Sequence, residues 1–264
     1  MSRLRSRRLL SVTVLVFAAS SMVAQVARGE DGPPPRIVGG TNDNYTNNQW
    51  VTALFLNGSQ ACGGSLVTRN YVLTAQHCTE HTQARNWRVR VGSKWDNQGG
   101  QVRQVKRLYE YPGFGHTGDG GIYGDLALMK LERRVSYKPV KLVPTNAAYV
   151  GYSGYISGWG DYYSGDPQAH HRLQRAWVPI LHDSDCAGLA GYRGSDMICA
   201  GAPYVADTCQ GDSGGPLAVY VDNRWQLVGV TSWGYGCAGE TPGAYAWVGA
   251  TTLRNWLYRR LGGR

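Results

Sequence analysis

The residues with the clearest chemical potential form the run Gly-Asp-Ser-Gly-Gly-Pro at positions 211–216 of this 264-residue sequence. A serine hydroxyl is a weak nucleophile at neutral pH, so Ser213 would need a base to take its proton and donors to hold the oxyanion that forms. The glycines around Ser213 allow a tight turn that can aim backbone N–H groups at one point. The run therefore predicts a nucleophile loop with its own oxyanion hole.

A histidine is the expected base, and the sequence contains six of them. His77 stands apart because it follows the apolar stretch Val72–Ala75 and is next to Cys78. A disulfide at this cysteine would pin the end of the strand and hold the imidazole rigidly. The other five lie among polar or turn residues, and we interpret them as solvated: His81, His116, His170, His171 and His182.

The third group should be a buried carboxylate that fixes the tautomer of the imidazole and stabilises the imidazolium. Asp125 fits this role because it directly precedes the apolar segment 126–131, which has the character of a strand. Asp119 is the rival, but it lies in a glycine-rich loop without an apolar strand to anchor it. We therefore predict Ser213, His77 and Asp125 as the catalytic residues.

Short apolar segments separated by Gly, Asn and Asp turns predict the elements that must position these groups. Their shortness and close spacing favour an all-β barrel or sandwich architecture. The segment 251–258 has Leu253, Trp256 and Leu257 at helical spacing, which predicts a terminal helix. The expected strands are 50–56, 65–74, 87–91, 102–109, 126–131, 155–158, 175–180, 217–221, 226–231 and 244–248.

The N-terminal segment has the organisation of an export signal: four arginines, an apolar run over 9–19 and then small residues. We assign residues 1–29 to a signal peptide whose cleavage site stays open, because several small residues would serve. Residues 30–36 form a proline-rich segment that ends at Arg36, and Ile37 follows abruptly. We interpret 30–36 as an activation propeptide, 37–264 as the catalytic domain and Arg36–Ile37 as a processing site.

Export implies an oxidising compartment, so the six cysteines indicate three disulfides and not a metal site. Spacing alone leaves 15 connectivities open. The net charge is +9, of which residues 1–36 contribute +4, since they hold six arginines and two acids. The remaining +5 is modest and lacks the dense basic stripe of a nucleic-acid binder, so we expect a solvated surface.

Four motifs resemble the chymotrypsin-fold serine proteases, and specifically the trypsins. They are Ile-Val-Gly-Gly from Ile37, Thr-Ala-Gln-His-Cys around His77, Asp-Leu-Ala-Leu from Asp125 and the run around Ser213, in the family's order. The resemblance extends from Ile37 to the terminal helix. It implies an all-β fold of two six-stranded antiparallel β-barrels packed face to face, with the triad between them and a C-terminal α-helix.

The same resemblance implies the disulfides Cys62–Cys78, Cys186–Cys199 and Cys209–Cys237. Such a set of three is closer to secreted bacterial trypsins than to vertebrate ones. It also implies that the N–H groups of Gly211 and Ser213 form the oxyanion hole. The segment Ser232-Trp233-Gly234 would pair with extended substrate backbone.

Specificity in this resemblance depends on Asp207, which matches the aspartate at the floor of the primary pocket. Gly234 and Gly243 match the small wall residues that admit a long side chain, so we expect cleavage after arginine or lysine. Processing would free an α-amine on Ile37, and that amine would pair with Asp212 and order the pocket. Because Arg36 suits this specificity, self-activation is a reasonable hypothesis.

The sequence departs from the family pattern at three places: Gln76 replaces the usual alanine before His77, Tyr235 is bulkier than usual near the pocket entrance, and 93–101 lacks the paired acids of a calcium loop. We expect no metal and no cofactor. The expected partners are protein or peptide substrates and protein inhibitors, without nucleic acid or membrane, and the enzyme should be a secreted monomer.

Three other functions compete with this hypothesis. An anion-binding surface function is supported only by the modest net charge of +5 after residue 36, and it is compatible with protease activity. A catalytically weak binding protein on the same fold would carry a substitution at Ser213, His77 or Asp125, and none is present. A protease that cuts after apolar residues would conflict with Asp207.

Overall fold

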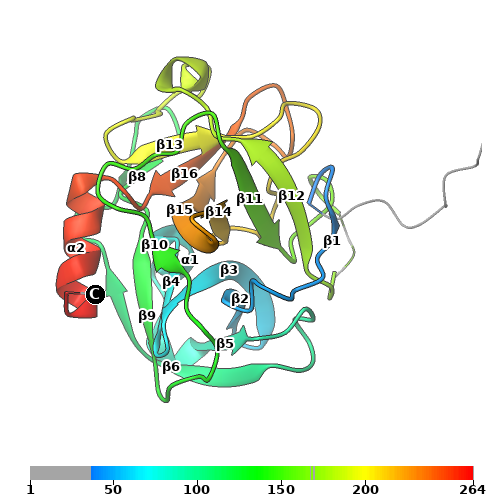
Figure 1. Cartoon of the computed structure of the whole chain (residues 1–264), viewed down its shortest axis with the longest axis vertical. Helices are drawn as coiled ribbons and strands as arrows, with labels where there is room; N and C mark the ends of the chain where they lie inside the picture. Colours follow the sequence, from blue (N-terminus) through cyan, green and yellow to red (C-terminus); the bar gives the residue numbers. More distant parts are fainter. Residues whose placement is uncertain (1–36, 167, 169, 264) are drawn as a thin grey trace, which may run out of the picture. The chain divides into compact units, whose positions relative to one another are not determined.

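The structure is a computed structural model that describes residues 37–166, 168 and 170–263 (Figure 1). The predicted signal peptide, the predicted propeptide and Arg36 lie outside the described residues.

A closed barrel of six antiparallel strands forms the first half of the described chain (Figure 1). Strand β5 (Trp87–Val91) shows the alternation of buried and exposed side chains that follows from the two-residue period of a β-strand. In this strand Trp87, Val89 and Val91 are buried while Arg88 is exposed. The barrel order is β2 (Val51–Leu56), β3 (Ser59–Thr68), β4 (Tyr71–Thr74), β9 (Ala127–Leu131), β6 (Gln101–Glu110) and β5 (Trp87–Val91).

The single strand predicted over 65–74 was wrong, because the chain turns back on itself there. Strands β3 and β4 pair in antiparallel fashion, with Ser65 opposite Leu73. The turn between them is stabilised locally, since the Thr68 hydroxyl donates to the Asn70 side chain at 3.1 Å. Such side-chain bonds favour turns over continuous strands, and an apolar pattern alone did not reveal this one.

A second sheet has eight strands, and β7 (Gly115–His116) and β8 (Ile122–Tyr123) pair separately as a two-stranded sheet. The order of the eight-stranded sheet is β1 (Thr41–Asn42), β12 (Gln174–Pro179), β11 (Ser153–Gly158), β14 (Pro216–Val221), β15 (Arg224–Trp233), β16 (Gly243–Trp247) and β13 (Met197–Ala200), and β10 (Lys141–Leu142) pairs with β15. An isolated bridge between Ile180 and Ala200 joins the end of β12 to β13. This bridge closes the six longer strands of the sheet, β12 to β13 in the order above, into a second barrel. The predicted two-barrel, all-β fold is confirmed.

The C-terminal helix α2 (Thr251–Leu261) is three residues longer than predicted. It buries Leu253, Trp256, Leu257 and Leu261, and it ends at Gly262, whose φ of 73° is the usual left-handed helix stop. The Trp256 ring meets the ring of Tyr111 edge-on, with 5.7 Å between centroids. The remaining short elements were not predicted: α1 (Gln76–Thr79), the 3-10 helices η1 (Ala84–Asn86) and η2 (Asp183–Cys186), β7 (Gly115–His116) and β8 (Ile122–Tyr123).

Three disulfides join Cys62 to Cys78, Cys186 to Cys199 and Cys209 to Cys237, which are the pairs that the family resemblance implies. The first ties β3 to α1 and so restrains the helix that carries His77.

Ile37 opens the described chain in an unusual conformation. Its side chain is fully buried, but its φ is +70°, a left-handed value that is rare for a β-branched residue. The next residue, Val38, forms an antiparallel bridge with Asp207. The start of the predicted catalytic domain therefore lies against the segment that holds the predicted specificity residue.

Candidate active site

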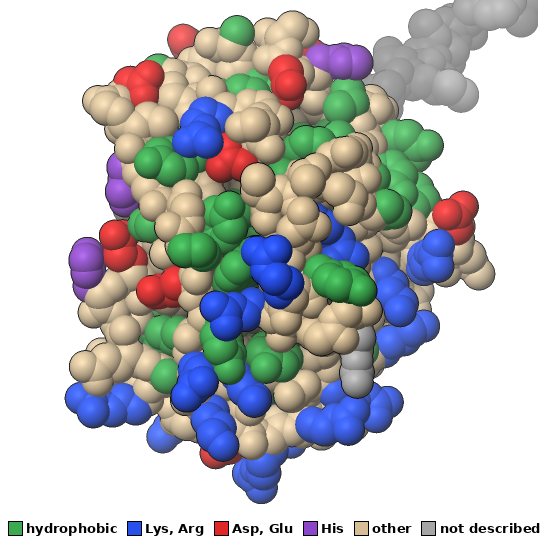
Figure 2. Space-filling model, turned by 90° about the vertical axis from the view of Figure 1, so that its left-hand side faces the viewer, with side chains coloured by type: hydrophobic (Ala, Val, Ile, Leu, Met, Phe, Trp, Pro, Cys, Tyr) green, Lys and Arg blue, Asp and Glu red, His purple; other side chains and the backbone are tan. Residues whose placement is uncertain are grey.

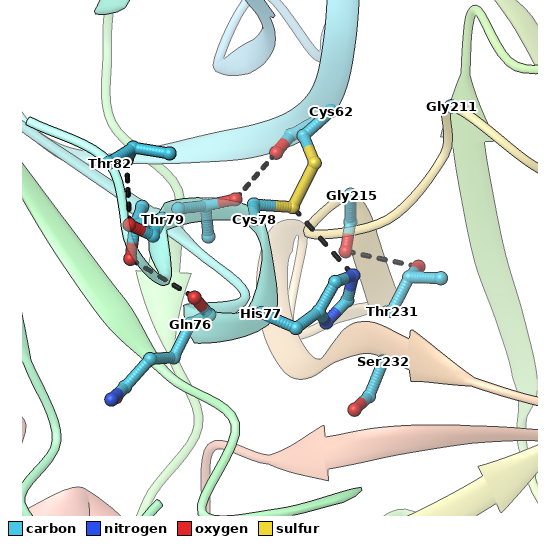
Figure 3. Close-up of a disulfide and its surroundings, with 12 residues drawn as sticks. Cys62, Gln76, His77, Cys78, Thr79, Thr82, Gly211, Gly215, Thr231 and Ser232 are labelled. Carbon is cyan, nitrogen blue, oxygen red and sulfur yellow. Dashed lines mark hydrogen bonds between the residues drawn. A yellow bond between two sulfur atoms is a disulfide. The ribbon is translucent and has the colours of Figure 1, made fainter. Parts of the chain in front are cut away.

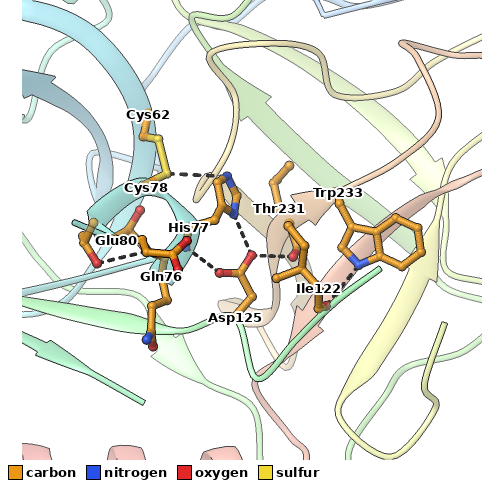
Figure 4. Close-up of polar contacts among 12 residues, drawn as sticks. Cys62, Gln76, His77, Cys78, Glu80, Ile122, Asp125, Thr231 and Trp233 are labelled. Atoms are coloured by element: carbon orange, nitrogen blue, oxygen red, sulfur yellow. Dashed lines mark hydrogen bonds and ion pairs between the residues drawn. A yellow bond between two sulfur atoms is a disulfide. The ribbon is translucent and has the colours of Figure 1, made fainter. Parts of the chain in front are cut away.

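The register of two paired strands brings His77 and Asp125 together. Strands β4 and β9 are antiparallel neighbours, with Thr74 opposite Ala127, so His77 just after β4 meets Asp125 just before β9. The imidazole Nδ1 lies 2.7 Å from Asp125 Oδ2, and the His77 backbone N–H donates to Asp125 Oδ1 at 2.9 Å (Figure 4). Two bonds from one residue fix both the ring and the carboxylate.

A third bond to Asp125 comes from the other barrel, because the hydroxyl of Ser232 in β15 donates to Asp125 Oδ2. Burial alone would raise the pKa of Asp125, but its bonds to His77 and Ser232 outweigh burial and hold that pKa below its usual value. Burial likewise opposes protonation of His77, yet Asp125 raises the pKa of the imidazole. The pair is therefore arranged to stabilise an imidazolium beside a carboxylate.

Because Nδ1 of His77 is bonded to Asp125, Nε2 is the ring nitrogen that remains to accept a proton. The contact that Nε2 makes among the described residues is with Cys78 Sγ of the Cys62–Cys78 disulfide, at 3.8 Å (Figure 3). The His77 side chain is 22% exposed, whereas that of Asp125 is 1% exposed. The unusual Gln76 points away from the imidazole in Figure 3, and its Oε1 accepts the Tyr111 N–H at 2.7 Å.

The serine loop packs closely against the chain just before His77. The Ser213 carbonyl accepts the Gly63 N–H at 2.7 Å, which joins the loop to β3. A Cβ on Gly214, whose φ is +78°, would lie 2.0 Å from Thr74 Oγ1, so only glycine permits this approach. Among the described residues the Ser213 hydroxyl has no hydrogen bond to His77, and such bonds often tighten only when substrate is bound.

Two backbone N–H groups, those of Gly211 and Ser213, donate to no other described residue. The peptide before Gly211 is held in place because the Gln210 carbonyl accepts the Asp161 N–H at 2.7 Å. Carbonyl and N–H point in opposite directions across a trans peptide, so this bond directs the Gly211 N–H the other way. Sequence reasoning selected Gly211 and Ser213 but missed Asp161.

Gln60 is a second residue that sequence reasoning missed. Its Nε2 donates to the Gly211 carbonyl at 3.1 Å, across 151 positions of sequence. It comes from β3, two residues before Cys62, so the first barrel braces the loop that carries Ser213. No local pattern marks Gln60, and only the folded chain reveals its neighbour.

A cavity of about 200 Å³ opens beside Ser213 and has Asp207 in its wall. Every residue predicted to bind substrate lines it, namely Asp207, Ser232, Trp233, Gly234 and Gly243. A Cβ on Gly243 would lie 2.9 Å from Asp207 Oδ1, so glycine keeps this space open. Tyr235 does not line the cavity, and its hydroxyl donates to the backbone carbonyls of Asp119 and Ala190.

Asp207 is a buried carboxylate, 5% exposed, with no cationic partner among the residues described. It accepts the N–H groups of Thr208 at 2.8 Å and Ala238 at 3.4 Å. Burial raises its pKa to about 6, and these two bonds only partly oppose that effect. A cation entering the cavity would satisfy the carboxylate.

Asp212 is fully buried and accepts the N–H groups of Gly160 at 2.8 Å and Cys209 at 3.0 Å. Burial raises its pKa to about 7. In the described part of the chain it has no positively charged partner either. The site thus holds two buried acids, Asp207 and Asp212, for which the described residues supply no counter-charge.

Within the described ranges, no three His, Cys, Asp or Glu side chains are grouped so that they could hold a metal ion. No helix in the same ranges is long and apolar enough to cross a membrane.

Two β-barrels, a histidine–carboxylate pair and a glycine-flanked serine loop define a serine endopeptidase of the chymotrypsin-like class. The family model described as Trypsin matches residues 37–257. "Trypsin alpha" of Drosophila erecta is 38% identical over 231 residues, which cover 84% of this chain and 86% of that protein. "Trypsin" of Saccharopolyspora erythraea is 40% identical over 223 residues, which cover 81% and 94%. The chain belongs to the trypsin family.

Proposed function

We propose that this serine endopeptidase is secreted as an inactive precursor, is activated by cleavage at Arg36–Ile37, and hydrolyses peptide bonds after arginine or lysine. The observation that carries the specificity is the common cavity of Ser213 and Asp207, in which a buried carboxylate lacks a cation. Curated relatives named trypsin support the same assignment.

In the proposed mechanism the Ser213 oxygen attacks the carbonyl carbon of the scissile peptide while His77 Nε2 takes the hydroxyl proton. Collapse of the tetrahedral intermediate breaks the C–N bond, and the imidazolium gives its proton to the leaving amine. Water then repeats the sequence and releases the acid from the serine ester. Asp125 keeps the Nδ1 proton in place throughout, which is the role that its two bonds to His77 support.

The tetrahedral oxygen would be held by the N–H groups of Gly211 and Ser213, which have no other acceptor among the described residues. Donors of this kind are worth roughly 10²–10³ in rate each. The carbonyls in the same peptides as these two N–H groups are held by the fold, because the Gln210 carbonyl accepts the Asp161 N–H at 2.7 Å and the Asp212 carbonyl accepts the Gly215 N–H at 2.8 Å. The two donors are therefore oriented before substrate arrives.

An arginine or lysine side chain in the cavity would pair its charge with Asp207. An apolar side chain there would leave the buried carboxylate unpaired, which is strongly unfavourable. Ser232, Trp233 and Gly234 follow along β15 and the residue after it, where an extended peptide could add as a further strand.

Activation is proposed to work through the second buried acid. A free α-amine on Ile37 would give Asp212 the cation that it lacks, and Asp212 directly precedes Ser213. Until then the buried carboxylate is uncompensated. The arginine at position 36 fits the proposed specificity, so the enzyme could activate itself.

The N-terminal pattern of residues 1–29 supports secretion. We further propose that the enzyme acts as a monomer on proteins and peptides, is open to protein inhibitors, and uses neither nucleic acid nor a membrane as a partner. The rival, a catalytically weak binding protein, has no observation in its favour, because Ser213, His77 and Asp125 are all present.

The direct test compares short amide substrates that differ only in the residue before the cut. With activated enzyme, kcat/KM should be highest for arginine and lysine, and Asp207→Asn should lower these two values much more than those for phenylalanine or alanine. Ser213→Ala is the control for contaminating protease. A preference of the native enzyme for phenylalanine or alanine would contradict the assignment of Asp207.

A further inference from the structure

The charged residues are divided unevenly between the parts of the fold. Residues 37–138, which include all six strands of the closed barrel, hold twelve Lys and Arg but seven Asp and Glu. Residues 139–250 hold five Lys and Arg but nine acids, and 251–264 hold four arginines and no acid. The first barrel and α2 are therefore basic, while the rest of the domain is acidic on balance. Figure 2 shows Lys and Arg side chains gathered over the lower half of one face.

Residues of the first barrel and α2 form a cluster that we call the Tyr109 patch: Tyr71, Arg107, Tyr109, Lys130 and Arg260. Arg107 and Arg260 lie over the ring of Tyr109, at 5.8 and 5.2 Å from its centroid. Lys130 lies 5.9 Å from the centroid of Tyr71, and the two tyrosine rings are 6.3 Å apart. Four elements, β4, β6, β9 and α2, thus converge on one patch.

The cations of the patch are not neutralised. Arg107 and Lys130 are direct cross-strand partners in β6 and β9, an arrangement that is destabilising for like charges. None of the three cations forms an ion pair with any described residue, and the only nearby arginine that does is Arg133, with Glu132. Partial burial would raise the pKa of Tyr109, but Arg107 and Lys130 outweigh it and lower that pKa. The patch therefore maintains a positive field at some cost to stability.

We propose that the Tyr109 patch binds a sulfated polysaccharide. Guanidinium groups match the planar, multi-oxygen geometry of sulfate and phosphate esters. They are mounted here on paired strands and a docked helix, so less freedom is lost on binding than on a loop. Exposed cations on the same barrel, Arg85, Arg88 and Lys106, extend the charge beyond the patch.

The covered tyrosine rings distinguish this partner from a single-stranded nucleic acid. Proteins that bind single strands offer open aromatic faces on which bases stack. In the patch, Arg107, Arg260 and Lys130 occupy the space over the two rings. Sulfate groups need the cations and not the rings, so they suit the patch better.

The test measures binding of heparin, as the sulfated polysaccharide, to the mature Ser213→Ala enzyme over a range of NaCl concentrations. Each cation near a charged surface strengthens binding by about fivefold. The double variant Arg107→Gln/Arg260→Gln removes two cations and should therefore raise the Kd by roughly 25-fold. It should also reduce the slope of log K against log salt by about one per cation removed. Lys141→Gln/Arg224→Gln, which removes two exposed cations elsewhere, is the matched control and should change the Kd little.

The ligands also need controls. Heparin stripped of sulfate keeps its sugars and carboxylates and should bind much more weakly, as should single-stranded DNA of equal charge. Equal losses in both double variants would mean that net charge alone is responsible, and the patch assignment would be overturned. Equal binding of desulfated heparin, or tighter binding of DNA, would overturn the choice of partner. Thermal unfolding of each variant checks that the fold is intact.

Discussion

Three aspartates in one site are buried to similar degrees but ionise differently, because of what each one contacts. Asp125 accepts bonds from an imidazole and a hydroxyl, and its pKa is lowered. Asp207 accepts two backbone N–H groups and the Thr208 hydroxyl, and Asp212 accepts two backbone N–H groups. These bonds do not offset burial, which raises the two pKa values to about 6 and about 7. The contacts of Asp125 therefore favour its ionised form. Asp207 and Asp212 would be stabilised in their ionised forms by a nearby cation.

The raised pKa of Asp207 predicts pH-dependent binding of a small cation such as benzamidinium. With a pKa of about 6 in the free enzyme, the ionised fraction falls about tenfold from pH 7 to pH 5. The Kd, measured by calorimetry on Ser213→Ala enzyme, should therefore rise roughly tenfold over that interval. Binding to Asp207→Asn should be weak and nearly independent of pH, and a wild-type Kd that does not change would contradict this pKa.

At the residue scale, the sequence predicted the groups that have a local signature. His77 and Asp125 each border an apolar strand, and Ser213 lies in a distinctive glycine-rich run. Gln60 and the backbone of Asp161 have no such signature, because their contacts to 210–211 exist only after the chain has folded. Long-range polar contacts of this kind are beyond a reading of local pattern.

The strands that the sequence predicted as separate elements have at least five residues, whether their burial alternates, as in β5 and β12, or is nearly continuous, as in β2 and β14. The missed strands are shorter. Strand β13 has four residues, and β1, β7, β8 and β10 have two residues each. The predicted neighbours His77 and Asp125 do lie together, because their contact depends on the register of β4 with β9 and the sequence pattern indicated both strand ends.

Helix α2 provides a test of how strongly one element is held to the barrels. Trp256 is 3% exposed and packs on Tyr111, so Trp256→Ala should lower the free energy of unfolding by about 3–5 kcal/mol. Tyr258, in the same helix, is 54% exposed, and Tyr258→Ala should change stability by less than about 0.5 kcal/mol. Urea unfolding of the Ser213→Ala protein measures both.

Equal effects of the two substitutions would show that α2 is not docked as described. A loss of unfolding free energy in Trp256→Ala alone would show that the buried side of α2 stabilises the protein.

For the whole molecule, the protonation state of Asp212 predicts that stability depends on pH in opposite directions before and after the proposed cleavage at Arg36–Ile37. In an uncut Arg36→Gln precursor its pKa of about 7 is above the unfolded value of about 3.9, so the folded state binds the extra proton. This contribution favours the fold below about pH 4 and is lost as pH rises to about 7, an effect of the order of 4 kcal/mol. In the cut form an Ile37 amine would lower that pKa, and the contribution should be lost on acidification instead.

Thermal unfolding between pH 4 and pH 7 measures this difference, on the Ser213→Ala background to prevent self-digestion. Asp212→Asn in the precursor removes the titrating group, so the difference from the unsubstituted precursor gives the part of the pH-dependent stability that is due to Asp212 and not to other carboxylates. The same pH slope in the cut form and the precursor would rule out the proposed pairing with Asp212.

The backbone conformation of Ile37 bears on the proposed cleavage at Arg36–Ile37. A β-branched residue at a φ of +70° carries a steric penalty of about 1–3 kcal/mol, which arises from its side chain and the preceding carbonyl. Hydrolysis of the bond before Ile37 would remove that carbonyl and with it the penalty. Re-forming the bond would restore the clash, so this strain would favour the cut form by the same amount, about 1–3 kcal/mol.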